Sequence, residues 1–112
     1  MELIRLHLWN YNKEIKYNKG RINVILVCSS KDGKLIGEEL IEPFKKFGDH
    51  VESKVNSEVQ MHVLVDVDYL ALIHENKIKN LPKLLIFKNG ELLETLEANI
   101  NIFDDKLITN HL

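Results

Sequence analysis

The stretch from Leu81 to Glu91 constrains the fold of this chain more than any other segment. Leu84 to Phe87 is a short apolar run, and Asn89-Gly90 supplies the two residues that a type I′ turn holds at positive φ. Leu92-Leu93 then begins a return strand. Pro82 precedes the first strand, where a missing backbone N–H removes no ladder hydrogen bond. The segment therefore predicts a β-hairpin that is entered through a proline.

Composition places the chain among ordinary globular proteins. It has 112 residues, of which 45% are hydrophobic and 29% charged, and this length predicts one domain over residues 1–112. The net charge is −2 and the basic residues are scattered, so no basic patch indicates a nucleic acid or an anionic membrane as partner. The sequence has no apolar run long enough to span a membrane and no signal peptide, so a cytoplasmic location is the default expectation.

Three further strands are predicted from hydrophobic periodicity. Leu3 to Trp9 alternates apolar and polar residues, which indicates a strand with one buried face. Ile22 to Cys28 is nearly all apolar and rich in β-branched residues, as a central strand covered on both faces would be. Met61 to Val67 has a similar composition. Ser29 to Gly33 is predicted to be a turn-rich break.

Four helices are predicted between and after these strands. A short one, with Asn10 or Asn12 as its cap, runs to Tyr17. A longer one starts near Leu35 and ends between Gly48 and Asn56. Its apolar face has helical spacing, and Pro43 is expected to kink it at a cost of roughly 3 kcal/mol. The members of that face are Leu40, Phe44, Phe47, Val51 and Val55. The remaining helices are Tyr69–Glu75, capped by Asp68, and Ile102–Leu112.

The resulting order is β-α-β-α-β-α-β-β-α. Right-handed crossovers join the parallel pairs, and the terminal hairpin adds an antiparallel edge. The predicted fold class is therefore α/β, with a mixed central sheet and helices on both faces.

This order and several short motifs resemble thioredoxins. Val65-Asp66-Val67-Asp68 is similar to the end of a thioredoxin strand, and Ile78-x-x-Leu81-Pro82 is similar to the segment that carries the family's cis-proline. Lys88-Asn89-Gly90-Glu91 matches the family's hairpin turn, and Ala98-Asn99 resembles the loop after the last strand. Pro43 falls where the family has a proline in its active-site helix. The resemblance implies a thioredoxin fold with Pro82 in the cis form.

The departures from the family pattern fall at its chemistry. The Cys-x-x-Cys turn of thioredoxins maps to about Lys34–Glu38, where no cysteine stands. The buried acid of the family falls near Cys28, and a groove glycine is replaced by Glu97. Disulfide exchange by a dithiol requires one low-pKa thiolate and a second, resolving thiol. Because Cys28 is the chain's one cysteine, we expect no dithiol reductase activity.

Cys28 has two interpretations. It can be a buried thiol at the end of a central strand, which behaves as a small hydrophobic residue. Alternatively, it can be the nucleophile of a monothiol oxidoreductase that uses an external thiol such as glutathione. The separation of Cys28 from Pro82 is longer than the family spacing, which favours the first interpretation.

Other polar residues suggest no cofactor or metal. The five histidines show no metal-ligand spacing, although His7 and His62 would approach each other if their strands were neighbours. Asp66 and Asp68 are expected to cap the following helix. Lys77, Lys79 and Lys83 are expected either on a solvated face or beside a peptide-binding groove.

The resulting hypothesis is a redox-inactive, monomeric interaction module that binds a protein or an extended peptide. The partner-binding residues are expected to surround the proline loop, and they are Leu35, Ile36, Leu81, Pro82 and Glu97. Leu35 and Ile36 would be exposed apolar residues at the former active-site turn. They can alternatively fold onto Pro43 and the core.

Overall fold

The structure is a computed structural model that describes residues 2–55 and 58–111. Its main feature is a mixed sheet with the strand order β1-β4-β2-β5-β6, to which β3 is added as a further partner of β2. The strands of the described residues are β1 (Ile4–Leu6), β2 (Ile22–Lys31), β3 (Lys34–Ile36), β4 (Val59–Val65), β5 (Lys83–Lys88) and β6 (Glu91–Glu97). β2 is parallel to β4 and antiparallel to β5, so the predicted α/β class with a mixed sheet is confirmed.

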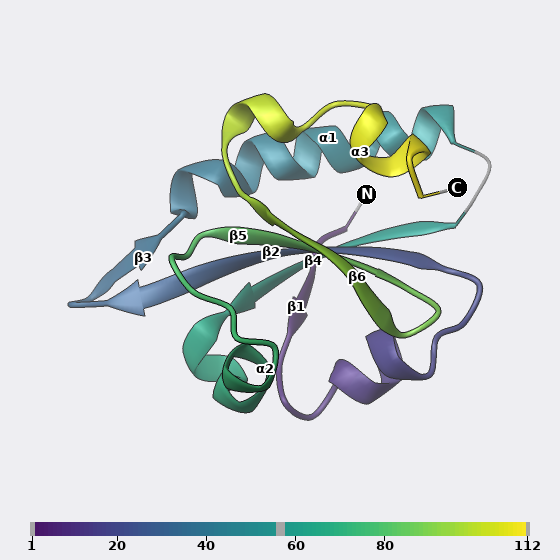
Figure 1. Ribbon diagram of the computed structural model, residues 1–112. Coiled ribbons are helices and arrows are strands. Elements are labelled where there is room, and N and C mark those ends of the chain that lie inside the picture. The colour runs from purple at the N-terminus through teal and green to yellow at the C-terminus, as the bar shows by residue number, and fades with distance from the viewer. Residues whose placement is uncertain (1, 56–57, 112) are drawn as a thin grey trace.

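Helices cover both faces of this sheet (Figure 1). α1 (Ile41–Lys54), η4 (Ile100–Ile102) and α3 (Lys106–Thr109) lie on the upper face in that view. α2 (Leu70–Glu75) and the π-helical turn η1 (Asn12–Lys16) lie on the lower face. Two single 3-10 turns, η2 (Glu38–Leu40) and η3 (Asp66–Asp68), precede α1 and α2.

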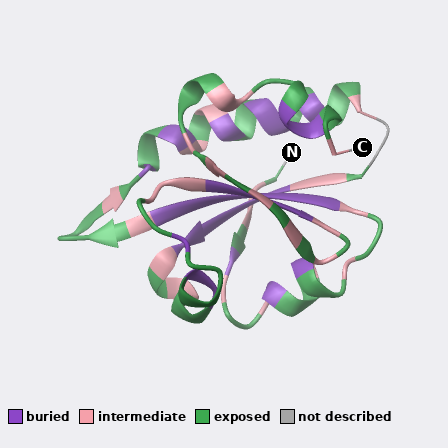
Figure 2. Cartoon of the chain, viewed as in Figure 1, coloured by how far each residue is buried: buried purple, intermediate pink, exposed green. Residues whose placement is uncertain are grey.

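Two hydrophobic cores form because β2 alternates its side chains between the two faces. Val24, Leu26 and Cys28 pack under α1, whereas Ile25 and Val27 pack in the opposite core with residues of η1 and α2. These β2 residues are fully buried, and Figure 2 shows the strand as the buried centre of the molecule. The prediction of a central strand covered on both faces is confirmed.

The hairpin of β5 and β6 has the predicted turn. Asn89 and Gly90 have φ values of 54° and 80°, which are the two positive values of a type I′ turn. The peptide bond between Leu81 and Pro82 is cis.

Several predicted element ends were wrong. β1 stops at Leu6 because the Asn10 side chain accepts a hydrogen bond from the His7 N–H (2.7 Å) and the chain turns there. The helix predicted over Ile102–Leu112 is replaced by the shorter α3, and η4, which precedes it, ends at Ile102. The Asp104 carboxylate accepts a hydrogen bond from the Lys106 N–H (2.8 Å) at the start of α3. Leu112 and Asn56 lie outside the described residues.

The largest error concerns the predicted break at Ser29–Gly33 and the helix start at Leu35. β2 instead continues to Lys31 and turns through Asp32 and Gly33 into β3. We call residues 29–36 the arm. α1 begins only at Ile41, because Gly37 has a left-handed backbone (φ 96°) that ends β3 and separates it from η2.

Pro43 does not kink a helix interior as predicted. It is the third residue of α1, and the N–H groups of a first helical turn have no acceptor within the helix. The expected cost of a helix-interior proline therefore does not apply.

In the part of the chain that the structure describes, no helix combines the length and the hydropathy that crossing a membrane requires.

Candidate functional site

The arm projects from the end of the sheet at which the parallel strands β2 and β4 finish (Figure 1). Ser29 pairs with Ile36 and Ser30 with Leu35, so alternation sends Leu35 and Ile36 to opposite faces of the arm. Leu35 is half-buried and packs against the core under α1. Ile36 is 39% exposed on the other face. Both residues were expected in one contact surface. They lie on opposite faces of the arm, although both border the hollow lined by residues 33–39.

A groove of about 460 Å³ lies between the arm and the chain segment 73–81, and we call it the proline groove. Its apolar lining consists of four aliphatic side chains: Ile36, Ile73, Ile78 and Leu81. The polar lining is Ser29, Lys31, Asp66, Lys79 and Asn80. The groove therefore has an aliphatic surface with hydrogen-bonding groups and lysines beside it, a combination that is typical of ligand-binding sites.

Asp66 fixes the arm in this position. Its carboxylate accepts hydrogen bonds from the Ser29 hydroxyl (2.9 Å), the Ser30 N–H (3.0 Å) and the Val67 N–H (2.8 Å). Asp66 therefore connects the end of β4 to the arm, and the prediction that it caps α2 was wrong.

Asp68 does not cap α2 either. Its carboxylate accepts two hydrogen bonds from the Arg5 guanidinium, at 3.1 and 2.9 Å. The residue before α2 is Tyr69, which makes no side-chain capping bond.

Gly37 sits where the arm meets Pro82. A Cβ atom on Gly37 would lie 2.9 Å from the Pro82 Cβ and 3.2 Å from the Cys28 Sγ. Contacts this short are sterically excluded without a shift of the neighbours, so only glycine fits between Cys28 and Pro82 in this arrangement. The position that faces the proline thus has no side chain with which to do chemistry.

Cys28 is fully buried under this contact. Burial raises the pKa of the Cys28 thiol to about 11, with further contributions from the negative charges of Glu39, Asp66 and Glu38. A nucleophilic thiolate requires the opposite environment, with solvent access and nearby positive charge. Cys28 therefore has the properties of a structural thiol.

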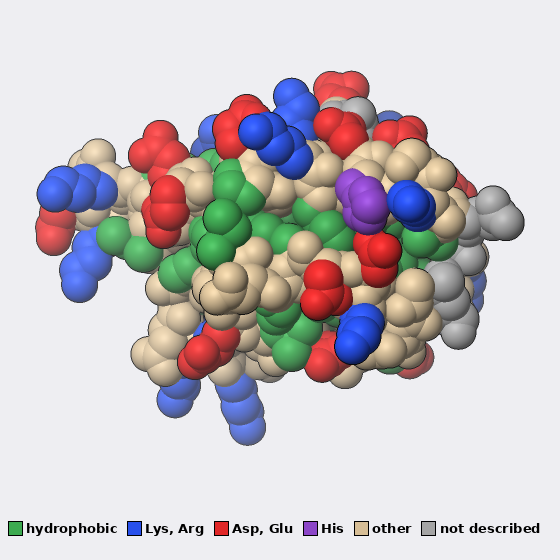
Figure 3. All heavy atoms as spheres, turned by 90° about the horizontal axis from the view of Figure 1, so that it is seen from above, with side chains coloured by type: hydrophobic (Ala, Val, Ile, Leu, Met, Phe, Trp, Pro, Cys, Tyr) green, Lys and Arg blue, Asp and Glu red, His purple; other side chains and the backbone are tan. Residues whose placement is uncertain are grey.

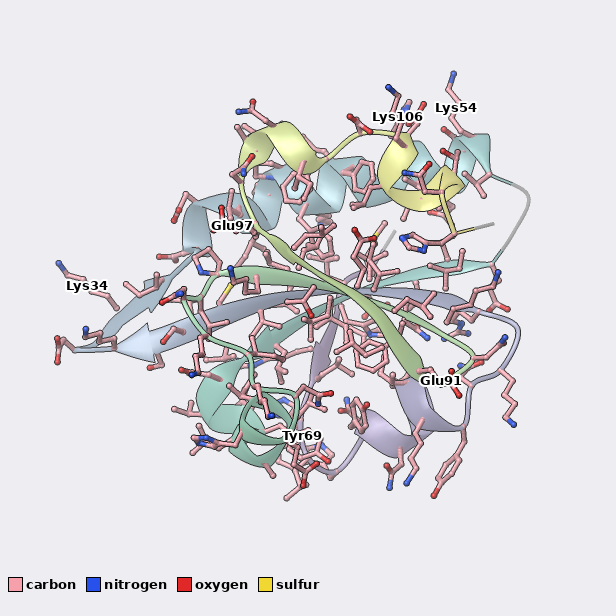
Figure 4. The ribbon with its side chains drawn as sticks, viewed as in Figure 1. Lys34, Lys54, Tyr69, Glu91, Glu97 and Lys106 are labelled. Carbon is pink, nitrogen blue, oxygen red and sulfur yellow. The ribbon has the colours of Figure 1, made fainter. Side chains whose placement is uncertain are left out.

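Glu97 lies on β6 directly opposite Lys83 of β5. Their charged groups are 3.8 Å apart, and the Glu97 side chain is largely exposed. Figure 4 shows Glu97 near the base of the arm, while Lys34 projects from the arm's tip. Glu97 does not line the proline groove.

The structure thus brings together two of the five predicted partner-binding residues, Ile36 and Leu81. Pro82 adjoins them through Gly37, whereas Leu35 and Glu97 lie elsewhere. Ile73 and Ile78 were not predicted to line the groove, since in the sequence each appeared to be an ordinary core residue. Lys79 had been placed near the proline loop, but Lys31 was missed because the arm was expected to be a turn.

The histidines that were considered for a metal site have different neighbours. His7 stacks on Trp9 and lies 3.5 Å from the Asp68 carboxylate. His62 is buried and its Nε2 lies 2.8 Å from the Asn23 Oδ1. Within residues 2–55 and 58–111, no group of three or more potential ligands is placed to hold a metal ion.

Comparisons with known proteins identify the architecture. No protein-family model matches the sequence, and no match is found among curated proteins. Among solved structures, the thioredoxin of Trypanosoma brucei brucei is similar with a TM-score of 0.73 at 13% identity, over 97% of this chain and 90% of that one. The Malassezia sympodialis thioredoxin (Mala s 13) is similar with a TM-score of 0.71 at 17% identity, over 98% and 90% of the two chains. The chain therefore has a thioredoxin-like fold.

Proposed function

We propose that this protein is a redox-inactive binding module that holds an extended segment of a partner protein in the proline groove. The observation that carries the proposal is the position of Gly37 between Cys28 and Pro82. At this position the scaffold has a close backbone contact in place of a reactive side chain. A groove with an aliphatic lining nevertheless persists beside it.

The groove has the features that binding requires. Ile36 and Leu81 are partly exposed on its two walls, so burying them under a partner residue would remove apolar surface from water. Asp66 holds one wall in place through hydrogen bonds to Ser29 and Ser30, so little ordering of that wall is needed on binding.

The alternative function, a monothiol oxidoreductase that uses Cys28 and glutathione, requires an accessible thiolate. The burial of Cys28 and its raised pKa of about 11 both oppose that requirement. We therefore favour binding over catalysis.

The binding proposal is tested by selecting random extended peptides on the immobilised protein and measuring their affinity for variants. Ile36→Asp places a charge on the groove wall, and we expect it to weaken binding at least tenfold. Ile100→Asp is the matched control, because Ile100 is also exposed but lies on η4, on the α1 side of the sheet. Equal binding by wild type and Ile36→Asp would exclude the groove, and a loss confined to Ile100→Asp would move the site to the α1 face.

The redox part of the proposal has a separate test. The protein is expected to reduce insulin disulfides in the presence of dithiothreitol no faster than its Cys28→Ser variant does. A wild-type rate well above that of the variant would establish thiol chemistry at Cys28 and overturn the proposal.

A further inference from the structure

We infer that the proline groove selects acidic segments, in which an aliphatic residue is flanked by aspartate or glutamate. This inference rests on the proposed binding function and adds the chemical class of the partner. It follows from the charges that the fold leaves unpaired around the groove.

One lysine stands on each wall. Lys31 belongs to the arm and Lys79 to the opposite segment, and both side chains are exposed and line the groove. Among the residues that the structure describes, neither lysine has an ion-pair partner. A ligand that enters the groove therefore passes between two positive charges without competing with an existing salt bridge.

Asp66 does not balance these charges for an incoming ligand. Its two oxygens already accept three hydrogen bonds, from the Ser29 hydroxyl and from the N–H groups of Ser30 and Val67. The carboxylate is therefore committed to holding the arm. These bonds use three of the roughly four acceptor positions of a carboxylate, so a basic ligand finds little of Asp66 left to bind, whereas an acidic ligand pairs with Lys31 and Lys79 directly.

A neighbouring hollow on the arm, which shares Ile36 with the groove, has a different charge. This hollow, lined by residues 33–39, contains Glu38 and Glu39 with only Lys34 on the positive side. Figure 3, in which the molecule is seen from above, shows both signs of charge along the projecting arm and apolar side chains at its base. The lining of the groove has two lysines and one aspartate, whereas that of the hollow has two glutamates and one lysine, so an acidic segment is favoured in the groove.

The lining favours a polypeptide over a nucleic acid as the anionic partner. Of the described residues that line the groove, none is aromatic, so no ring is available for base stacking. The four aliphatic side chains instead match a Leu, Ile or Val side chain of a protein segment. The net charge of the whole chain, −2, also opposes general attraction to a polyanion.

The inference is tested with three sets of synthetic peptides that share a central Leu or Ile and differ only in their flanks. One set has Asp and Glu flanks, one has Ser and Gln, and one has Lys and Arg. Affinity is measured from amide shifts in 15N spectra of the whole protein, which also show whether the groove residues Ile36, Ile78 and Leu81 respond. The acidic set is expected to bind at least tenfold more tightly than the basic set, and its affinity should fall as salt is raised.

Charge reversals identify the lysines responsible. Lys31→Glu and Lys79→Glu are each expected to weaken binding of the acidic set about fivefold, the scale of an exposed ion pair replaced by a repulsion. Lys45→Glu makes the same change of net charge on exposed α1 surface, and it should alter the affinity less than twofold.

Each outcome has a distinct meaning. Binding of all three sets with equal affinity, accompanied by shifts at the groove, would overturn the acidic selectivity and leave the binding function in place. An absence of groove shifts with every set would overturn both. Tighter binding of an oligothymidine at the groove than of the acidic peptides would overturn the inference in favour of nucleic acid.

Discussion

Gly37 illustrates how a single residue determines the shape of the site. Its backbone has a φ of 96°, and a Cβ atom added to it would meet both Pro82 and Cys28. Two separate constraints therefore act on it, the left-handed backbone and the lack of room for a Cβ atom.

Gly37→Ala is expected to lower the free energy of unfolding by about 2–5 kcal/mol, the sum of a left-handed alanine (about 1–2 kcal/mol) and an overpacked contact (about 1–3 kcal/mol). Gly20→Ala isolates the first term, because Gly20 has a φ of 82° and no atom within 4 Å of the added Cβ. Gly20→Ala should lower the free energy of unfolding by about 1–2 kcal/mol. Urea denaturation measures the free energy of unfolding of both variants. An equal loss in the two variants would show that the contact of residue 37 with Pro82 and Cys28 does not exclude a Cβ atom.

His62 is the second residue with a measurable consequence. It is fully buried, and its Nε2 donates a hydrogen bond to the Asn23 Oδ1, which can only accept. Burial lowers the pKa of His62 to about 3, with a smaller contribution from the positive charge of Arg21. The unfolded chain has this group near its ordinary value of 6.5, so the unfolded state binds more protons between pH 6.5 and 3.

The stability that comes from keeping His62 neutral should therefore be fully present above pH 6.5 and be lost as the pH falls toward 3. The contribution of His62 to this slope approaches about 1.4 kcal/mol per pH unit. In His62→Gln, where the side chain does not titrate and still offers an amide to Asn23, the slope between pH 7 and 5 should be shallower. Chemical denaturation across that range, with His74→Gln as an exposed control, makes the measurement. Identical slopes for wild type and His62→Gln would contradict the account.

At the scale of elements, the arm explains why part of the site escaped prediction. Its strands have one apolar residue on each face, Leu35 and Ile36, so no run of alternation indicates them. The sequence did contain one indication of the arm's hairpin, the dipeptide Asp32-Gly33. In the structure these residues have φ values of 51° and 74°, so they form a turn of the same kind as Asn89-Gly90. The turn at Asn89-Gly90 was predicted because apolar strands flank it, whereas Asp32-Gly33 follows the polar end of β2 and precedes the three-residue β3.

The arm depends on an anchor as well as on its own ladder. Asp66→Ala removes the acceptor of the Ser29 and Ser30 hydrogen bonds, and charge-assisted bonds of this kind contribute about 1.5–3 kcal/mol each. Amide hydrogen exchange in residues 29–36 should accelerate at least tenfold in this variant. Asp68→Ala, which removes an exposed pair with Arg5, should leave the arm's exchange unchanged. Unaltered exchange in Asp66→Ala would mean that strand pairing alone holds the arm.

At the scale of the whole molecule, the sheet and its cores could be predicted because burial imposes regular patterns on the sequence. The apolar β2 and β4, the hairpin and the spaced face of α1 all follow from that requirement. The groove could not be predicted in full, because its residues come from segments far apart in the sequence and only their placement in the fold joins them. Ile36 and Leu81 were found through the resemblance to thioredoxins, whereas Lys31 and Ile73 needed the structure.

The proposed function requires that this thioredoxin-like scaffold has a binding groove and no reactive thiol. The pH dependence of Cys28 alkylation in the native protein tests it most directly. Because Cys28 is fully buried and has a pKa raised to about 11, we predict negligible modification by iodoacetamide at pH 7–8 and complete modification after denaturation in urea. Rapid alkylation of the native protein with a midpoint below pH 8 would contradict the account.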